Sequence, residues 1–153
     1  MNSGVGLIAP LVQIFFTDFL VRQRRVSPQT VASYRDTFRL LIQHVSQDTG
    51  QKPSDLTLEN LQAKAILQFL DSLEKDRGNS IQTRNARLAA VRSFFRLVTL
   101  RDPDHIDLAA QVLAIPVKRA DRRLIRYLTR PEIEAILATP DQQTRGGRRD
   151  YAL

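Results

Sequence analysis

Apolar side chains recur every three or four positions along most of the chain, and this spacing predicts an all-α fold. The first stretch begins at Pro10 and reads "PLVQIFFTDFLVRQR". The second follows Ser27 as N-cap with Pro28 at the first helical position, and Gly50 ends it. No segment shows the clean apolar–polar alternation of a strand.

Three further helices are predicted before a change in composition. A connector with short helical turns covers 53–60, and a third helix covers roughly 62–76. Asn79 and Gln82 have the spacing of a capping-box pair for a fourth helix, which Asp102-Pro103 ends. A short helix from about 106 to 114 completes the series.

A basic stretch then separates this bundle from one more helix. The sequence "IPVKRADRRLIRYL" is typical of an extended linker, which we place at 115–127. In "LTRPEIEAILATP", Thr129 and Glu132 form a capping box and Pro140 ends the helix. We therefore expect a helical domain over 8–114 and a separate segment over 128–153.

The charge balance of the sequence indicates what kind of partner the protein binds. The formal net charge is +7 and the pI is about 10.5, which favours a polyanion, nucleic acid first and an anionic membrane second. No apolar run is long enough to span a bilayer and no signal peptide is recognisable, so a cytoplasmic location is expected. Cysteine is absent and His44 and His105 lie far apart, so no metal site or cofactor is expected.

The fourth helix concentrates this charge in an unusual way. Its arginines stand in "GNSIQTRNARLAAVRSFFRLVTLR", a stretch without any acid. Arg92 and Arg96 fall opposite the apolar side, whereas Arg84 and Arg87 lie in the first two turns and are expected to project beyond the core toward a ligand. The alternative is a surface on which these arginines pair with acids of the third helix.

Nothing in the sequence indicates catalysis by this chain. No nucleophile lies near a base in a recognisable pattern, and no glycine-rich loop follows a strand. We therefore assign no catalytic residue.

The order of these pieces resembles the N-terminal part of tyrosine recombinases, the phage-integrase and Xer/Cre-like family. The resemblance rests on "VSPQTVASYRDTFRLLIQHV", on "SIQTRNARLAAVRSFF" and on "RYLTRPEIEAILATP", in that order. It implies a four- to five-helix SAM-like core-binding bundle, followed by a linker and the first helix of a catalytic domain truncated at Leu153.

In that family the bundle forms half of a clamp around a recombination site, with its second and fourth helices facing the major groove. The implied partners are double-stranded DNA and other recombinase protomers on the same DNA, with no membrane and no small-molecule substrate. By position, the resemblance implies DNA contacts from Gln29, Thr30, Ser33, Arg39, Gln82, Thr83, Arg84, Arg87, Lys118, Arg119, Arg122 and Arg123.

The family's chemistry uses a tyrosine nucleophile assisted by arginines, a lysine and histidines, all in the part that would follow this sequence. None of Tyr34, Tyr127 and Tyr151 stands at the nucleophile position, so we expect binding of DNA without cleavage. The rival hypothesis is a helical protein-interaction module or truncated regulator without a DNA role. It predicts that the Arg84 and Arg87 end of the fourth helix is covered by acids or packed against protein.

Overall fold

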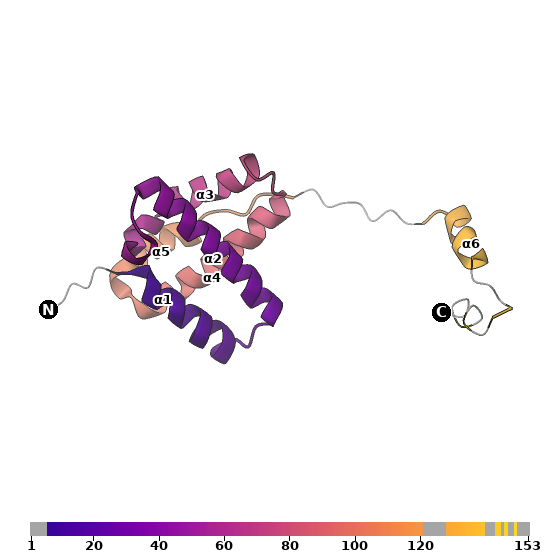
Figure 1. The fold of residues 1–153 in the computed structure, drawn as a ribbon, viewed down its shortest axis with the longest axis horizontal. Coiled ribbons are helices and arrows are strands. Elements are labelled where there is room, and N and C mark those ends of the chain that lie inside the picture. Colours follow the sequence, from indigo (N-terminus) through magenta and orange to yellow (C-terminus); the bar gives the residue numbers. More distant parts are fainter. Residues whose placement is uncertain (1–5, 121–127, 140–142, 145, 147–148, 150–153) are drawn as a thin grey trace. The chain divides into compact units, whose positions relative to one another are not determined.

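The computed structural model describes residues 6–120, 128–139, 143–144, 146 and 149. The chain divides into two compact units, 1–120 and 121–153, and each is described by itself. The described residues confirm the all-α fold, since their elements are helices and the only pairing outside them is an isolated antiparallel bridge between Leu7 and Thr57. Figure 1 shows helices α1 to α5 gathered into one bundle.

The first predicted helix differs from the structure in both start and type. Helix α1 covers Ile8–Ile14 and runs directly into η1, a π-helix over Phe15–Gln23, so Pro10 lies inside the first turn. Residues five positions apart share a side of a π-helix because its hydrogen bonds join residues i and i+5. Phe15 and Leu20 have this spacing and are both fully buried. The wider turn therefore brings two large apolar side chains into the core.

Helix α2 has the predicted bounds, Pro28–Thr49. The Ser27 hydroxyl accepts a hydrogen bond of 3.2 Å from the Thr30 amide, which satisfies one of the free donors at the helix start. Gly50 ends the helix with φ of 68°, a left-handed conformation that glycine adopts without strain. Both end signals in the sequence are confirmed.

The connector and third helix also match the expectation. Two 3₁₀ turns, η2 at Pro53–Asp55 and η3 at Leu58–Leu61, precede α3 at Ala63–Lys75. A capping box between Thr57 and Asn60 opens η3.

Helix α4 covers Ile81–Arg101, but its cap is not the predicted one. Ser80 is the N-cap, and its hydroxyl accepts a hydrogen bond of 3.2 Å from the Thr83 amide. The Asn79–Gln82 pairing was therefore wrong by one residue. A 3₁₀ turn, η4 at Pro103–His105, and helix α5 at Ile106–Leu113 follow, as the sequence predicted.

The second unit contains α6, Arg130–Ala138. The predicted capping box is confirmed, because the Thr129 amide and hydroxyl both donate to Glu132 Oε2, at 2.7 and 2.8 Å. These bonds hold the pKa of Glu132 below its usual range, the backbone bond first.

An aromatic cluster fixes the first half of α2 against α4. Phe15 of η1 is fully buried and lies within 6.3 Å, ring centre to ring centre, of five other rings. These rings belong to Phe16, Phe19, Tyr34, Phe38 and Phe94. Interior packing of this kind is rigid, so the two helices hold a fixed mutual position.

Candidate nucleic-acid interface

A shallow groove lies between the N-terminal halves of α2 and α4. Its side chains are mainly small or hydroxyl-bearing and include no acid. They are Ser27, Gln29, Thr30, Ser33, Tyr34, Ala86 and Ala89. Hydroxyl and amide groups can both donate and accept hydrogen bonds, and alanine lets another surface approach closely. We call this surface the α2/α4 groove.

Three of the sequence-predicted contacts, Gln29, Thr30 and Ser33, line this groove together. Gln29 and Ser33 are exposed, whereas Thr30 is half-buried and its hydroxyl lies 2.9 Å from that of Ser27. At the start of α4, Gln82 is exposed and Thr83 is half-buried beside the Ser80 hydroxyl.

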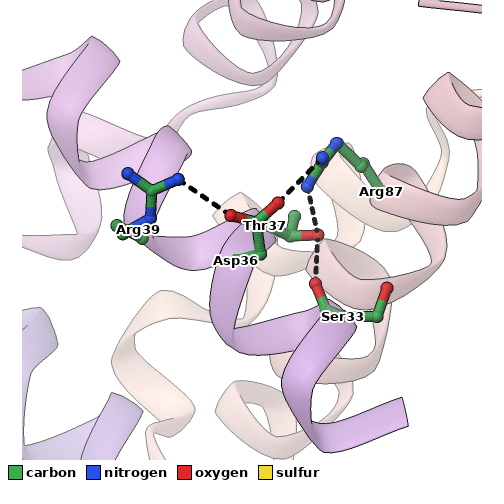
Figure 2. Close-up of polar contacts among 5 residues, drawn as sticks. All are labelled: Ser33, Asp36, Thr37, Arg39 and Arg87. Atoms are coloured by element: carbon green, nitrogen blue, oxygen red, sulfur yellow. Dashed lines mark hydrogen bonds and ion pairs between the residues drawn. The ribbon is translucent and has the colours of Figure 1, made fainter. Parts of the chain in front are cut away.

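Arg87 is held inside the protein rather than directed outward. Its guanidinium forms an ion pair of 2.9 Å with Asp36 of α2 and donates to the Thr37 hydroxyl at 3.2 Å, as Figure 2 shows. Arg39 pairs with the other oxygen of Asp36, also at 2.9 Å. Hydrogen bonds from Arg39, then Arg87, hold the pKa of Asp36 below its usual range. Asp36 is therefore the ion-pair partner of two of the arginines that were predicted to contact DNA.

Arg84 does not project beyond the core as expected. It is 3% exposed, and its guanidinium donates to the Asn85 side chain at 3.2 Å and to the Pro116 carbonyl at 3.4 Å. The segment after α5 covers it, because Ile115 packs into the core next to that carbonyl. A contact between Arg84 and DNA stays a prediction, and it would require this cover to move.

Two of the three remaining α4 arginines, Arg92 and Arg101, have partners other than the acids of α3 that the salt-bridged alternative requires. Arg92 donates two hydrogen bonds, of 2.8 and 3.2 Å, to the Leu113 carbonyl, and Arg101 pairs with Asp18 at 3.6 Å. Within the described residues, no ion pair joins an α4 arginine to an acid of α3. The packing of Arg84 and the pairing of Arg87 are instead what the protein-interaction hypothesis predicted for them.

Only two of the four linker residues predicted to contact DNA belong to the described part of the structure. The Lys118 ammonium pairs with Glu74 of α3, while Arg119 is exposed. Arg122 and Arg123 lie outside the described residues.

A basic loop ahead of α2 was missed by the sequence prediction. Arg22 at the end of η1, and Arg24 and Arg25 in the loop that follows, are exposed a few residues before Ser27, which lines the groove. Arg22 forms an ion pair of 3.7 Å with Asp18, and the Arg24 guanidinium lies 5.9 Å above the Phe19 ring. The signal is the run "RQRR" at residues 22–25, just ahead of the Val26-Ser27-Pro28 start of α2.

Arg25 in this loop has φ of 49°, in the left-handed region that an arginine rarely adopts. The turn directs the chain from η1 into α2. Such a conformation costs on the order of 1 kcal/mol or more, and the surrounding structure must sustain it.

The described part of the chain lacks two other kinds of site. There, no group of three or more histidine, cysteine, aspartate or glutamate side chains is placed to hold a metal ion. No helix in those residues has the length and hydropathy needed to cross a membrane.

Known proteins place this fold in a family. The model of the phage integrase N-terminal SAM-like domain matches residues 14–102, more than half of the chain. A Sinorhizobium fredii protein named "Putative integrase/recombinase y4rC" is 47% identical over 95% of this chain, and "Putative integrase/recombinase y4rD" of the same organism is 46% identical over 94%. Tyrosine recombinase XerD of Haemophilus influenzae is 28% identical over 94%. No solved structure matches.

The chain covers 44%, 51% and 44% of the lengths of these three relatives, so it corresponds to about half of each. The matched domain is the bundle that builds the α2/α4 groove. The chain therefore belongs to the tyrosine recombinase or phage integrase family and carries that family's N-terminal SAM-like domain.

Proposed function

We propose that this chain binds double-stranded DNA as the N-terminal portion of a site-specific recombinase. The observation that carries the proposal is an acid-free groove between two rigidly packed helices, bordered by a basic loop. Family membership supports the same partner, since the relatives are named as integrases and recombinases.

The two parts of this surface suit different parts of DNA. In the described residues, no acid pairs with Arg24 or Arg25, so both can neutralise phosphates. Gln29, Ser33 and Gln82 carry exposed groups that can both donate and accept, which suits the edges of bases in a groove. Phosphate contacts would fix the position of the protein, and the polar groups would provide discrimination between sequences.

Cutting and rejoining DNA is proposed only for a full-length recombinase. This chain is proposed to bind, with no catalytic residue assigned and with other protomers as further partners on the DNA. A DNA partner also agrees with the cytoplasmic location expected from the sequence, which stays a prediction.

A second candidate function is a protein-interaction module without a DNA role. Arg84 is 3% exposed and Arg87 is paired with Asp36, so neither is free to meet a ligand in this structure. The two functions differ in where free positive charge is needed: only DNA binding depends on Arg24 and Arg25.

A salt titration of binding to a labelled duplex tests the proposal. If the protein neutralises about five phosphates, the logarithm of affinity should fall against the logarithm of salt with a slope of about −4 to −5. A slope near zero, or no binding at low salt, would reject DNA binding and favour the protein-interaction function.

A further inference from the structure

The chain that leaves α5 is fastened along α4. We call residues 115–119 the linker strap. Ile115 is buried in the core, and the next residue, Pro116, accepts the hydrogen bond from Arg84. The side-chain amide of Asn85 then pairs with the main chain of Lys118 in both directions. Asn85 Nδ2 donates to the Lys118 carbonyl at 2.7 Å, and Asn85 Oδ1 accepts from the Lys118 amide at 3.0 Å.

Contacts on either side of this pair hold the strap in one path. Ahead of it, Arg92 donates to the carbonyl of Leu113 at 2.8 Å, near the end of α5. At its far end, the Lys118 ammonium pairs with Glu74 of α3. The chain therefore runs antiparallel to α4, from Arg92 back toward Asn85.

The strap borders the exposed strip of α4. At about 100° per residue, Gln82, Ala86 and Ala89 share one side of the helix. All three are exposed, and both alanines line the α2/α4 groove. Arg87 lies on one flank of this strip, where it meets Asp36 of α2, and Asn85 lies on the other flank, where it meets the strap. A ligand seated on the strip is thus bordered by α2 and by residues 118–119.

The lysine in the strap is engaged by Glu74, whereas Arg119 is exposed and has no acid partner within the described residues. Arg119 follows directly after the residue that Asn85 holds. Its main chain is therefore positioned even though its side chain is free.

We propose that Asn85 is a positioning residue: by holding the main chain of Lys118 it presents Arg119 beside the exposed strip of α4 to the phosphate backbone of bound DNA. This inference rests on the proposed DNA-binding function. The asparagine side chain offers both a donor and an acceptor, as a neighbouring strand would, whereas alanine offers neither. The two bonds to Lys118 are near solvent, so water replaces them in a variant, and the buried Arg84 guanidinium keeps its bond to the Pro116 carbonyl; the bundle therefore stays folded.

Limited trypsin digestion tests the strap without DNA. Trypsin cleaves after Lys118 and Arg119, and cleavage after Arg25 serves as an internal reference. Asn85→Ala should raise the rate at residues 118 and 119 several-fold relative to Arg25, while Gln111→Ala, an exposed amide on α5, should not. An unchanged ratio in Asn85→Ala would overturn the strap and with it the proposal.

Asn85→Asp tests whether the donated hydrogen bond, rather than the size of the side chain, holds the strap. It keeps the acceptor for the Lys118 amide but sets a carboxylate oxygen against the Lys118 carbonyl. It should therefore open the strap at least as much as alanine does. Protection equal to wild type would show that the donated bond does not hold the strap, and would overturn the proposal.

DNA binding tests the role of Arg119. Asn85→Ala and Arg119→Ala should each weaken duplex binding about 3- to 10-fold and reduce the salt slope by about 0.9, the loss of one phosphate contact. The double variant should bind no more weakly than Arg119→Ala alone. Losses that add in full would overturn the positioning role, since independent residues add.

The two failures are distinguishable. If wild-type protein binds no duplex at low salt, the proposed function fails and the role of Arg119 fails with it, whatever the trypsin result. If wild-type protein binds and the two losses add, only the positioning role fails and DNA binding stands.

Discussion

Arg87 of α4 and Asp36 of α2 form an ion pair of 2.9 Å one turn beyond the groove residue Ser33. Asp36 also pairs with Arg39, so a single carboxylate neutralises two arginines for which the family resemblance implies DNA contacts. The pair ties the two groove-forming helices together at the same time. Asp36 therefore both supports the geometry of the groove and lowers its positive charge.

Asp36→Asn should raise the affinity for duplex DNA. The change removes one negative charge and releases Arg39 and Arg87, which become free for phosphates, so the salt slope should steepen by about 1 to 2. The loss of a charge-assisted bond to the 17% exposed side chain of Arg87 should destabilise the fold by about 1 kcal/mol. Fluorescence anisotropy at several salt concentrations and a thermal melt measure the two effects.

Asp48→Asn is the matched control. It removes the same charge from the same helix, about 18 Å further along at 1.5 Å per residue, well beyond the screening length of about 8 Å at physiological salt. An equal gain in affinity from both variants would show a net-charge effect and remove Asp36 from the interface. No gain from either would favour the protein-interaction function.

The basic loop should contribute to binding through charge alone. Arg24→Gln and Arg25→Asn should each reduce the salt slope by about 0.9 and weaken random and specific duplexes alike, because phosphates carry no sequence. Asparagine is chosen at position 25 because it tolerates the left-handed φ of 49° that this residue adopts. Salt titrations on two unrelated duplexes provide the measurement.

Arg77→Gln offers a control with the same charge change. Arg77 is exposed in the turn between α3 and α4 and lines a different pocket, with His44 and Phe69. Its slope should equal that of wild type. If all three variants lose the same amount, the loop has no special position relative to DNA.

Much of the fold was predictable because local signals determine it. Ser27 opens α2 through a bond from the Thr30 amide, Gly50 ends it with a left-handed φ of 68°, and the capping box of Thr129 and Glu132 opens α6. The helix ends predicted from these signals agree with the structure because capping depends only on nearby backbone groups.

The site was less predictable because long-range contacts decide it. Arg84 and Arg87 lie near the apolar sector of α4 in any helical projection, but their partners, Pro116 and Asp36, are 32 and 51 residues away. Spacing along one helix cannot show that a distant carbonyl or carboxylate will reach the guanidinium. The π-helix of η1 was missed for a similar reason, since the aromatic core that favours it comes from three separate elements.

The cap of α4 can be tested directly. Ser80→Ala should lower the free energy of unfolding by about 1 kcal/mol, since the Thr83 amide loses its acceptor. Asn79→Ala should change it by less than about 0.5 kcal/mol, as for a surface position without a special role. Denaturant unfolding compares the two. The reverse order would restore the cap that the sequence had suggested.

The stability of the bundle should fall as pH rises above about 6.5, through His105. Its Nε2 lies 2.8 Å from Glu59 and its Nδ1 lies 2.9 Å from Asp102, so the doubly protonated ring can donate to both carboxylates. These bonds, the one with Glu59 first, raise the pKa of His105 in the folded state. The folded protein then binds more protons than the unfolded chain, so the stabilisation is complete below the unfolded pKa and is lost through the folded one.

The titration of Glu59 should not mask this dependence at neutral pH. The Thr57 hydroxyl first, and then His105, lower the pKa of Glu59 to about 2, so Glu59 stays ionised over the whole range in which His105 titrates. Thermal midpoints from about pH 5.5 to 8.5, on both sides of the ordinary histidine pKa of about 6.5, should decline for wild type and stay nearly level for His105→Gln. His44→Gln, which alters the other histidine and leaves the contacts of His105 with Glu59 and Asp102 in place, should still decline. Parallel curves for wild type and His105→Gln would show that the Glu59–His105–Asp102 contacts do not stabilise the fold through protonation.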